Sequence, residues 1–146
     1  MNLTDALRGE HGVFYAQFTH LEQTVPSVEE LAVLKSQAAM LAAALATHAQ
    51  LEEELLFRAL DPHLGEGGPL SMMRAEHEEI EQALAQIPGL VDLAETQRRV
   101  LHVVEFARQH FAKEEQVLFR LAAQSLGDEM LRDLGAKWAE RRGVMI

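Results

Sequence analysis

The chain has 146 residues, of which 48% are hydrophobic and 25% are charged, and it contains no cysteine. This length supports one domain with a single core, and the composition is that of a globular protein, not a disordered or fibrous one. The 13 Lys and Arg residues against 23 Asp and Glu residues give a net charge of −10, which argues against binding to nucleic acid or anionic lipid. The missing cysteines exclude disulfides, thiolate metal sites and iron–sulfur clusters.

The first residues, Met1 to Gly12, include acidic side chains and lack an apolar run of signal-peptide length. No stretch approaches the about 18 consecutive apolar residues of a membrane span. We therefore expect a cytoplasmic protein without a membrane or nucleic acid partner, present as a monomer or homodimer.

Segments rich in Pro, Gly and Asp interrupt the chain at four places, and good helix formers fill the sequence between them. This pattern predicts an all-α protein with helices near 4–24, 28–60, 70–87 and 91–125, and a short C-terminal helix near 128–141. Ser27 and Glu30 match a capping box, so we expect the second helix to begin there.

Each predicted helix carries an apolar stripe at alternating steps of three and four residues, which is typical of an antiparallel up-down four-helix bundle. We expect one domain over residues 1–146, with the bundle at about 4–125 and a C-terminal extension at about 126–146. In the first and third helices the stripe runs through Leu7, His11, Phe14, Phe18 and Leu21, and through Leu70, Met73, His77, Ile80, Leu84 and Ile87. In the second and fourth helices it includes His48, Glu52, Leu55 and Ala59, and His110, Glu114, Val117 and Leu121.

Six polar residues interrupt these stripes, and they occur in two similar halves of the chain. A His-x-x-x-Glu pair interrupts the second helix and another interrupts the fourth, and a single histidine preceded by Arg-x-Glu interrupts each of the other two. The six residues are His11, His48, Glu52, His77, His110 and Glu114. The repeat predicts a duplicated helical hairpin with a pseudo-twofold axis through the core.

Residues four apart lie on one helix face, so each His-x-x-x-Glu pair can converge on one point between the helices. An unpaired buried carboxylate costs several kcal/mol, whereas a whole domain is stable by only about 5–15 kcal/mol. A shared cation would compensate these groups. The alternative is a metal-free bundle in which Glu52 and Glu114 neutralise protonated histidines, and such a network must satisfy every donor and acceptor.

The ligand types narrow the choice of metal. Imidazole suits zinc, copper, iron and nickel, and six nitrogen and oxygen ligands exceed the needs of one tetrahedral zinc ion, so two ions are favoured. Ferritin-type di-iron bundles use Glu-x-x-His, and none of the seven histidines has a glutamate three residues before it.

The order His11, His48-x-x-x-Glu52, His77 and His110-x-x-x-Glu114, one element per helix, resembles the hemerythrin-like (HHE cation-binding) family of four-helix bundles over roughly residues 5 to 121. The resemblance implies two iron ions in the core, with zinc or manganese as substitutes. It also implies that Glu52 and Glu114 bridge the ions, with His11 and His48 on one and His77 and His110 on the other. The implied partner is a small oxidant or diatomic ligand, namely dioxygen, peroxide or nitric oxide.

Two positions depart from the oxygen-carrying members of that family. Met73 stands where they have a second histidine, and Glu114 replaces an aspartate one residue further along. Each ion would then keep an open position, which suits chemistry with a small oxidant better than reversible oxygen storage. Tyr15, one turn after His11, is interpreted as a buried flanking residue with a paired hydroxyl, with an additional ligand or a hydrogen-bond donor behind the ligands as the alternative.

Several residues near the stripe are left outside the expected ligand set. Glu53 and Glu115 are interpreted as solvated or ion-paired, with a supporting role behind the ligands as the alternative. Glu10 and Glu76 are left off the site because neighbours in sequence do not face each other on a helix. His20, His63 and His102 are expected on the surface. Two other functions stay open: an iron or zinc storage or sensing module without turnover, and a metal-free interaction bundle.

Overall fold

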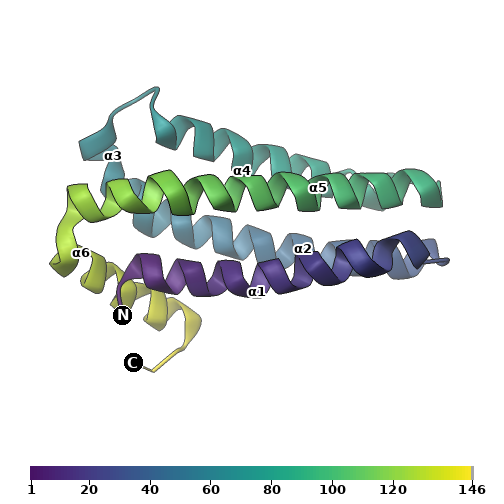
Figure 1. Cartoon of the computed structure of the whole chain (residues 1–146), viewed down its shortest axis with the longest axis horizontal. Coiled ribbons are helices and arrows are strands. Elements are labelled where there is room, and N and C mark those ends of the chain that lie inside the picture. The colour runs from purple at the N-terminus through teal and green to yellow at the C-terminus, as the bar shows by residue number, and fades with distance from the viewer. Residues whose placement is uncertain (146) are drawn as a thin grey trace.

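The computed structural model describes residues 1–145, and helices dominate this range, which contains no strand. Long helices run antiparallel to one another, side by side along the long axis of the molecule, and both termini lie toward the same end (Figure 1). The all-α up-down four-helix bundle is therefore confirmed. The elements in chain order are α1 (Leu3–Thr24), the 3₁₀ turn η1 (Val25–Ser27), α2 (Leu31–Leu51), the π-helical turn η2 (Glu52–Phe57), α3 (Arg58–Leu64), α4 (Pro69–Ala85), the 3₁₀ turn η3 (Ile87–Gly89), α5 (Leu93–Lys113), the π-helical turn η4 (Glu114–Leu118) and α6 (Phe119–Arg142).

The beginnings of α1 and α2 differ from the sequence-based expectation. A capping box forms at α1, where the Asn2 side chain accepts a hydrogen bond from the Asp5 amide and the Asp5 side chain accepts one from the Asn2 amide. The capping box expected at Ser27 is wrong, because Ser27 belongs to η1 and α2 begins at Leu31. The buried side chain of Val25 and the Pro26 ring hold that tight turn.

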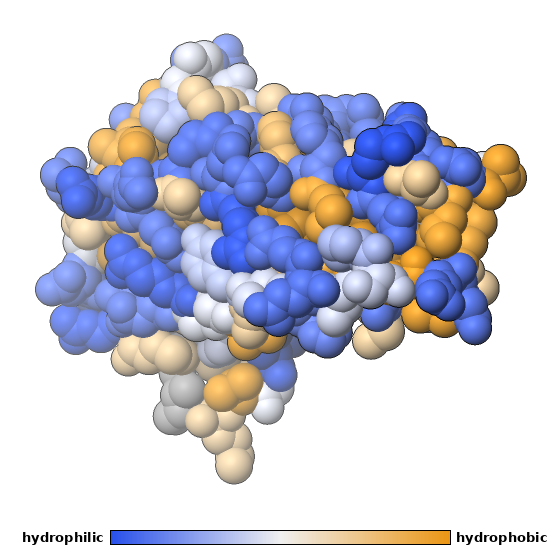
Figure 2. Space-filling view, turned by 45° about the vertical axis from the view of Figure 1, so that its right-hand side comes forward, coloured by the Kyte–Doolittle hydropathy of each residue, from blue (hydrophilic) through white to orange (hydrophobic). Residues whose placement is uncertain are grey.

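The core consists of two apolar clusters, one toward each end of the bundle. The cluster near the η1 and η3 turns includes Phe14, Phe18, Leu41, Ile80 and Phe111. The second cluster lies near the other end and includes Leu7, Leu56, Phe57, Met73 and Phe119. On each helix the predicted polar residues lie close to the point where one cluster gives way to the other, so apolar residues flank them toward both ends of the bundle. Hydrophilic residues cover most of the molecular face that Figure 2 shows.

The π-helical turns η2 and η4 each begin at a glutamate of a His-x-x-x-Glu pair. The amide of Arg58 donates to the carbonyl of Glu53, and the amide of Phe119 donates to the carbonyl of Glu114, each across five residues. Such a turn contains one residue more than an α-helical turn, so it shifts the buried face beyond it. Val117, expected in the stripe, is therefore 48% exposed, and Leu118 is buried in its place.

The C-terminal part of α6 leaves the bundle direction at Gly127, whose φ of 76° lies in the left-handed region that favours glycine. Residues 128–142 then run back beside the start of α1 (Figure 1). Leu131 and Leu134 are buried in the second cluster, so this part of α6 packs on the end of the bundle. Gly135 meets the start of the chain so closely that a Cβ atom there would lie 2.9 Å from the carbonyl oxygen of Met1.

The continuous helix Leu31–Leu64 is long and apolar enough to cross a membrane by length and composition alone. The core helix of a helical bundle passes the same test. This helix contributes His48 and Glu52 to the interior of the bundle, where both are buried. We therefore interpret it as a bundle helix.

Candidate metal centre

All six residues predicted from the polar pattern come together at one level of the bundle. The structure divides them into two overlapping groups whose potential ligand atoms lie within 4.8 Å of one another: His11, His48, Glu52 and Glu114, and Glu52, His77, His110 and Glu114. All six residues are buried, and His77 is the most exposed at 9%. Each group therefore has two imidazoles of its own and shares the two carboxylates with the other group.

The Nε2 atoms of the four histidines face the shared carboxylates. His77 Nε2 lies 3.2 Å from Glu52 Oε2, and His110 Nε2 lies 3.0 Å from Glu114 Oε1. The corresponding distances are 3.7 Å for His48 to Glu52 and 3.6 Å for His11 to Glu114. His11 Nε2 and His48 Nε2 are themselves 3.2 Å apart. The ring nitrogens thus converge toward the two carboxylates from both sides.

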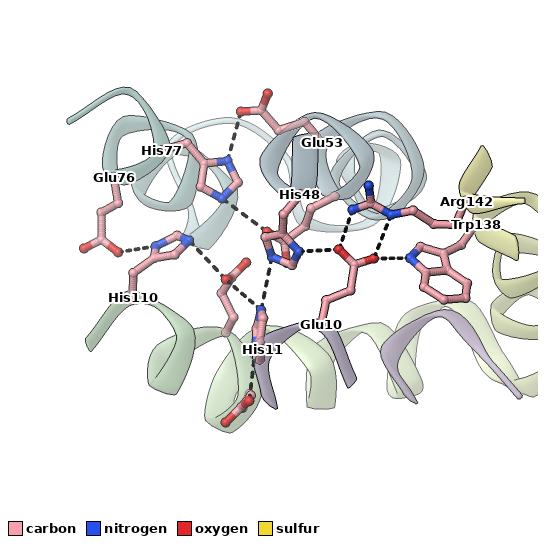
Figure 3. A network of polar contacts seen from close by, with 12 residues as sticks. Glu10, His11, His48, Glu53, Glu76, His77, His110, Trp138 and Arg142 are labelled. Carbon is pink, nitrogen blue, oxygen red and sulfur yellow. Dashed lines mark hydrogen bonds and ion pairs between the residues drawn. The ribbon is translucent and has the colours of Figure 1, made fainter. Parts of the chain in front are cut away.

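The outer nitrogen of each imidazole donates a hydrogen bond to a second glutamate (Figure 3). The Nδ1–Oε1 distances are 3.0 Å for His11 to Glu115, 3.0 Å for His48 to Glu10, 3.2 Å for His77 to Glu53 and 2.9 Å for His110 to Glu76. A carboxylate accepts, so Nδ1 carries the proton and a neutral imidazole presents a lone pair at Nε2. This arrangement fixes the tautomer in the way that metal-ligating histidines require.

The interior of the site is consequently rich in acceptors and poor in donors. Within residues 1–145, both carboxylate oxygens of Glu52 and of Glu114, and Nε2 of His77 and of His110, are buried without a hydrogen-bond partner. A buried acceptor without a partner is costly, and a buried carboxylate more so. Cations between these atoms would satisfy the lone pairs of all four imidazoles and both carboxylates, so the residues fit a pair of metal ions.

The pKa shifts in the metal-free chain have the same physical origin. Burial and repulsion from Glu52 raise the pKa of Glu114 well above its ordinary value. Burial and the neighbouring His48 lower the pKa of His11 to about 4, and burial and His77 lower the pKa of His110. For His77, burial opposes the charged form, but attraction by the Glu52 and Glu53 carboxylates outweighs it and raises the pKa. Two buried carboxylates cannot both stay charged cheaply without cations.

Each of the four outer glutamates accepts a hydrogen bond from one site histidine. The expectation that Glu10 and Glu76 lie off the site is therefore wrong, because each supports a histidine on a neighbouring helix, and Glu53 and Glu115 take the supporting role given as their alternative. The rule that sequence neighbours do not face each other holds within one helix. It says nothing about the adjacent helix, where the partner of each glutamate lies.

Tyr15 and Met73 lie beside the site without joining the two groups of potential ligands. The partly buried Tyr15 donates its hydroxyl to Glu115 Oε2 at 3.3 Å, so the hydroxyl is paired, and Tyr15 takes the role of a donor behind His11 rather than that of a ligand. Met73 is buried in the second apolar cluster. His20, His63 and His102 are exposed, as expected.

A cavity of about 780 Å³ between α2 and α4 reaches the imidazoles from the surface. Small side chains of α2, including Ala38, Ala42 and Ala49, form much of its wall, and Ile80 and Leu84 of α4 face them. His48, His77, His110 and Phe111 line its inner part. The cavity gives a small molecule a largely apolar path to the site.

The bundle and its buried cluster define a helical protein with a histidine–carboxylate metal-binding site. The chain matches the family model of the hemerythrin HHE cation-binding domain over residues 2–122, and it therefore belongs to that family. Comparisons with curated proteins and with solved structures gave no match. The family match ends shortly after α6 begins, so the last part of α6 lies beyond it.

Proposed function

We propose that this chain is a non-haem di-iron protein that reacts with or senses a small oxidant, namely dioxygen, peroxide or nitric oxide. His11 and His48 would hold one iron, His77 and His110 the other, and Glu52 and Glu114 would bridge them. The observation that carries the proposal is the set of four Nε2 atoms directed at two buried, unpartnered carboxylates. A bound pair of irons would supply redox chemistry and Lewis acidity there.

The rest of the chain has three roles around such a centre. The outer glutamates hold the Nδ1 protons and keep Nε2 free, and Phe111 packs against the imidazoles of His11 and His48. The cavity between α2 and α4 supports a small, uncharged ligand, because its wall is largely alanine and aliphatic side chains. The set of nitrogen and oxygen ligands also accommodates zinc or manganese, so storage or sensing without turnover is the second candidate function.

Metal analysis combined with spectroscopy tests the proposal. Anaerobic reconstitution with ferrous iron should give two irons per chain, and oxidation with peroxide should produce near-ultraviolet and visible charge-transfer bands. His110→Ala should lose these bands, whereas His102→Ala, which changes an exposed histidine outside the site, should keep them. A colourless wild type after reconstitution and oxidation would contradict the oxidant function, and zinc retained with no iron bound would favour the second candidate.

A further inference from the structure

One of the four outer glutamates is held by a part of the chain outside the family match. Arg142 Nη2 donates to Glu10 Oε1 at 2.5 Å, and Arg142 Nε donates to Glu10 Oε2 at 3.2 Å. The indole nitrogen of Trp138 donates to Glu10 Oε2 as well. The same Oε1 accepts the Nδ1 proton of His48 at 3.0 Å. Figure 3 shows this row of contacts running from the C-terminal part of α6 through Glu10 to His48.

Two of the equivalent glutamates are held differently. Glu76, which supports His110, is paired with Lys113 of α5, and Glu115 receives the hydroxyl of Tyr15. Both of these partners lie within residues 2–122, which match the family model. Glu10 differs because its partners, Trp138 and Arg142, lie after the kink at Gly127.

We propose that residues 128–142 form a strap that controls how firmly the His11 and His48 half of the centre holds its metal ion. Trp138 and Arg142 act as positioning residues, since they contact Glu10 and not the ligand atoms. This inference rests on the proposed function only in assuming that the site binds metal. It assigns the C-terminal extension a role and makes the two halves of the centre unequal.

The physical effect passes from the strap through Glu10 to His48. Three donors of the strap fix the Glu10 carboxylate, and the fixed carboxylate fixes the tautomer and orientation of the His48 ring. Partners behind a metal ligand typically change metal affinity by about 10- to 100-fold when they are removed. If the strap detaches, Glu10 loses all three donors and is free to turn toward solvent, and His48 loses its support.

The coupling must act in both directions, because linkage between two equilibria is reciprocal. If a docked strap strengthens metal binding at His48, then metal at His48 strengthens docking of the strap. Trp138 is the single tryptophan of the chain, so its fluorescence reports the state of the strap directly. Metal binding should therefore reduce quenching of Trp138 by a soluble quencher.

The test is a titration of the full-length protein with Co²⁺, followed by visible absorption and by Trp138 fluorescence. Wild type should bind two ions. Arg142→Met should weaken one of the two binding steps by about 10-fold or more and leave the other unchanged. Arg141→Met is the matched control on the same helix, because Arg141 pairs with Glu54 and not with Glu10, and it should bind both ions as wild type does. Trp138→Phe, which removes only the indole donor, provides a second variant should Arg142→Met fail to fold.

A double-mutant cycle separates positioning from a general loss of stability. His48→Ala removes the ligand through which the strap acts, so Arg142→Met should cause no further loss of Co²⁺ affinity in that background. Lys113→Met, which releases Glu76 behind His110, should weaken Co²⁺ binding further in the same background.

The failure of the strap and the failure of the metal site give different results. Wild-type affinity for both ions in Arg142→Met, with Trp138 exposed to quencher, would overturn the strap and leave the metal site standing. An additive loss in the His48→Ala background would also overturn it. A wild type that binds no Co²⁺, Zn²⁺ or Fe²⁺ would refute the metal site, and the strap with it.

Discussion

The phenyl ring of Phe57 lies parallel to the imidazole of His77, with ring centroids 5.3 Å apart and planes 9° apart. Phe119 takes the equivalent place beside His11, at 5.7 Å and 22°. A guanidinium group lies over each phenyl ring, Arg74 over Phe57 at 5.5 Å and Arg8 over Phe119 at 5.3 Å. The repeated Arg-x-x-His sequence thus corresponds to the same arrangement in both halves of the chain. In each half a guanidinium group covers a phenyl ring, and that ring covers the imidazole of a site histidine.

Metal should stabilise the fold, and its removal should lower the melting temperature. At a free ion concentration 100 times the Kd, binding to the native state adds about 2.7 kcal/mol for each ion. Scanning calorimetry with and without a chelator measures this difference. In the double variant Glu52→Leu/Glu114→Leu the chelator should have no effect. A wild-type melting temperature that ignores the chelator would indicate a metal-free bundle.

The pKa of Tyr15 should be measurable directly, because Tyr15 is the single tyrosine of the chain. Burial and the Glu115 carboxylate raise this pKa from 10.0 to about 12. The folded state therefore binds the phenol proton more tightly than the unfolded state. This contribution to stability is complete below pH 10 and is lost as the pH rises toward about 12. Ultraviolet absorbance of the phenolate gives the midpoint.

Glu115→Gln is the control for the Tyr15 titration. It removes the charge but retains an acceptor, so the midpoint should move down from about 12 while remaining above 10.0, since burial persists. A wild-type midpoint at the ordinary value of 10.0 would show that the hydroxyl is not held by Glu115.

Phe111 supports both the core and His11, and its removal should be costly. Its ring stacks on the His11 imidazole with centroids 3.9 Å apart and planes 7° apart, and the residue is 1% exposed. Phe111→Ala should lower the free energy of unfolding by about 3–5 kcal/mol. Denaturant unfolding checks this, with Phe106→Ala, at a partly buried position of the same cluster, as the less destabilising control. Equal losses in both variants would contradict a special role for Phe111.

Filling the cavity between α2 and α4 should slow access to the centre without emptying it. Ala42 lines the cavity, so Ala42→Leu should reduce the rate of oxidation of the iron-loaded protein by peroxide while the metal content stays constant. Ala43 is exposed on the same helix and does not line the cavity, so Ala43→Leu is the matched control. Stopped-flow absorbance measures both rates. Identical rates would mean that the oxidant enters by another path.

Gly135 should tolerate no side chain, because a Cβ atom there would meet backbone atoms of Met1, Asn2 and Leu3 at 2.9–3.1 Å. Gly135→Ala should therefore loosen the strap and expose Trp138 to a soluble quencher. Gly9→Ala places a methyl group in open space on α1 and should stabilise the protein by about 0.5–1 kcal/mol. Protection of Trp138 from the quencher in Gly135→Ala would contradict this prediction. It would show that the strap accommodates the added methyl group despite its close contact with the N-terminus.

The bundle and the six central residues could be predicted because both depend on periodicity. Apolar residues at helical spacing define the buried face of each helix. The polar pairs can be recognised because they occupy positions on these faces, as His48 and Glu52 do on one helix and His110 and Glu114 on another. The residues behind the histidines could not be found in this way. Glu10 supports His48 from another helix, and such pairing depends on how the helices are rotated against each other, which one sequence does not specify.

The π-helical turns were missed for a different reason. The prediction assumed a single helical period through each stripe, which placed Val117 inward. A signal was nevertheless present, since both Glu52 and Glu114 are followed by a second acidic residue, one further polar residue and then three apolar residues ending in Phe57 or Phe119. Three consecutive apolar residues are more than one face of an α-helix can bury. An inserted residue shifts the buried face and so changes which of them point into the core.

Because each π-helical turn contains an inserted residue, the number of residues in the turn matters more for the structure than which residues they are. Deleting one residue between Glu114 and Phe119 would restore an ordinary helix and rotate everything beyond it by about 100°. Phe119 would then leave His11, and Trp138 and Arg142 would leave Glu10, although no ligand had been replaced. Single-residue deletions in these two turns should therefore be far more damaging than almost any substitution there.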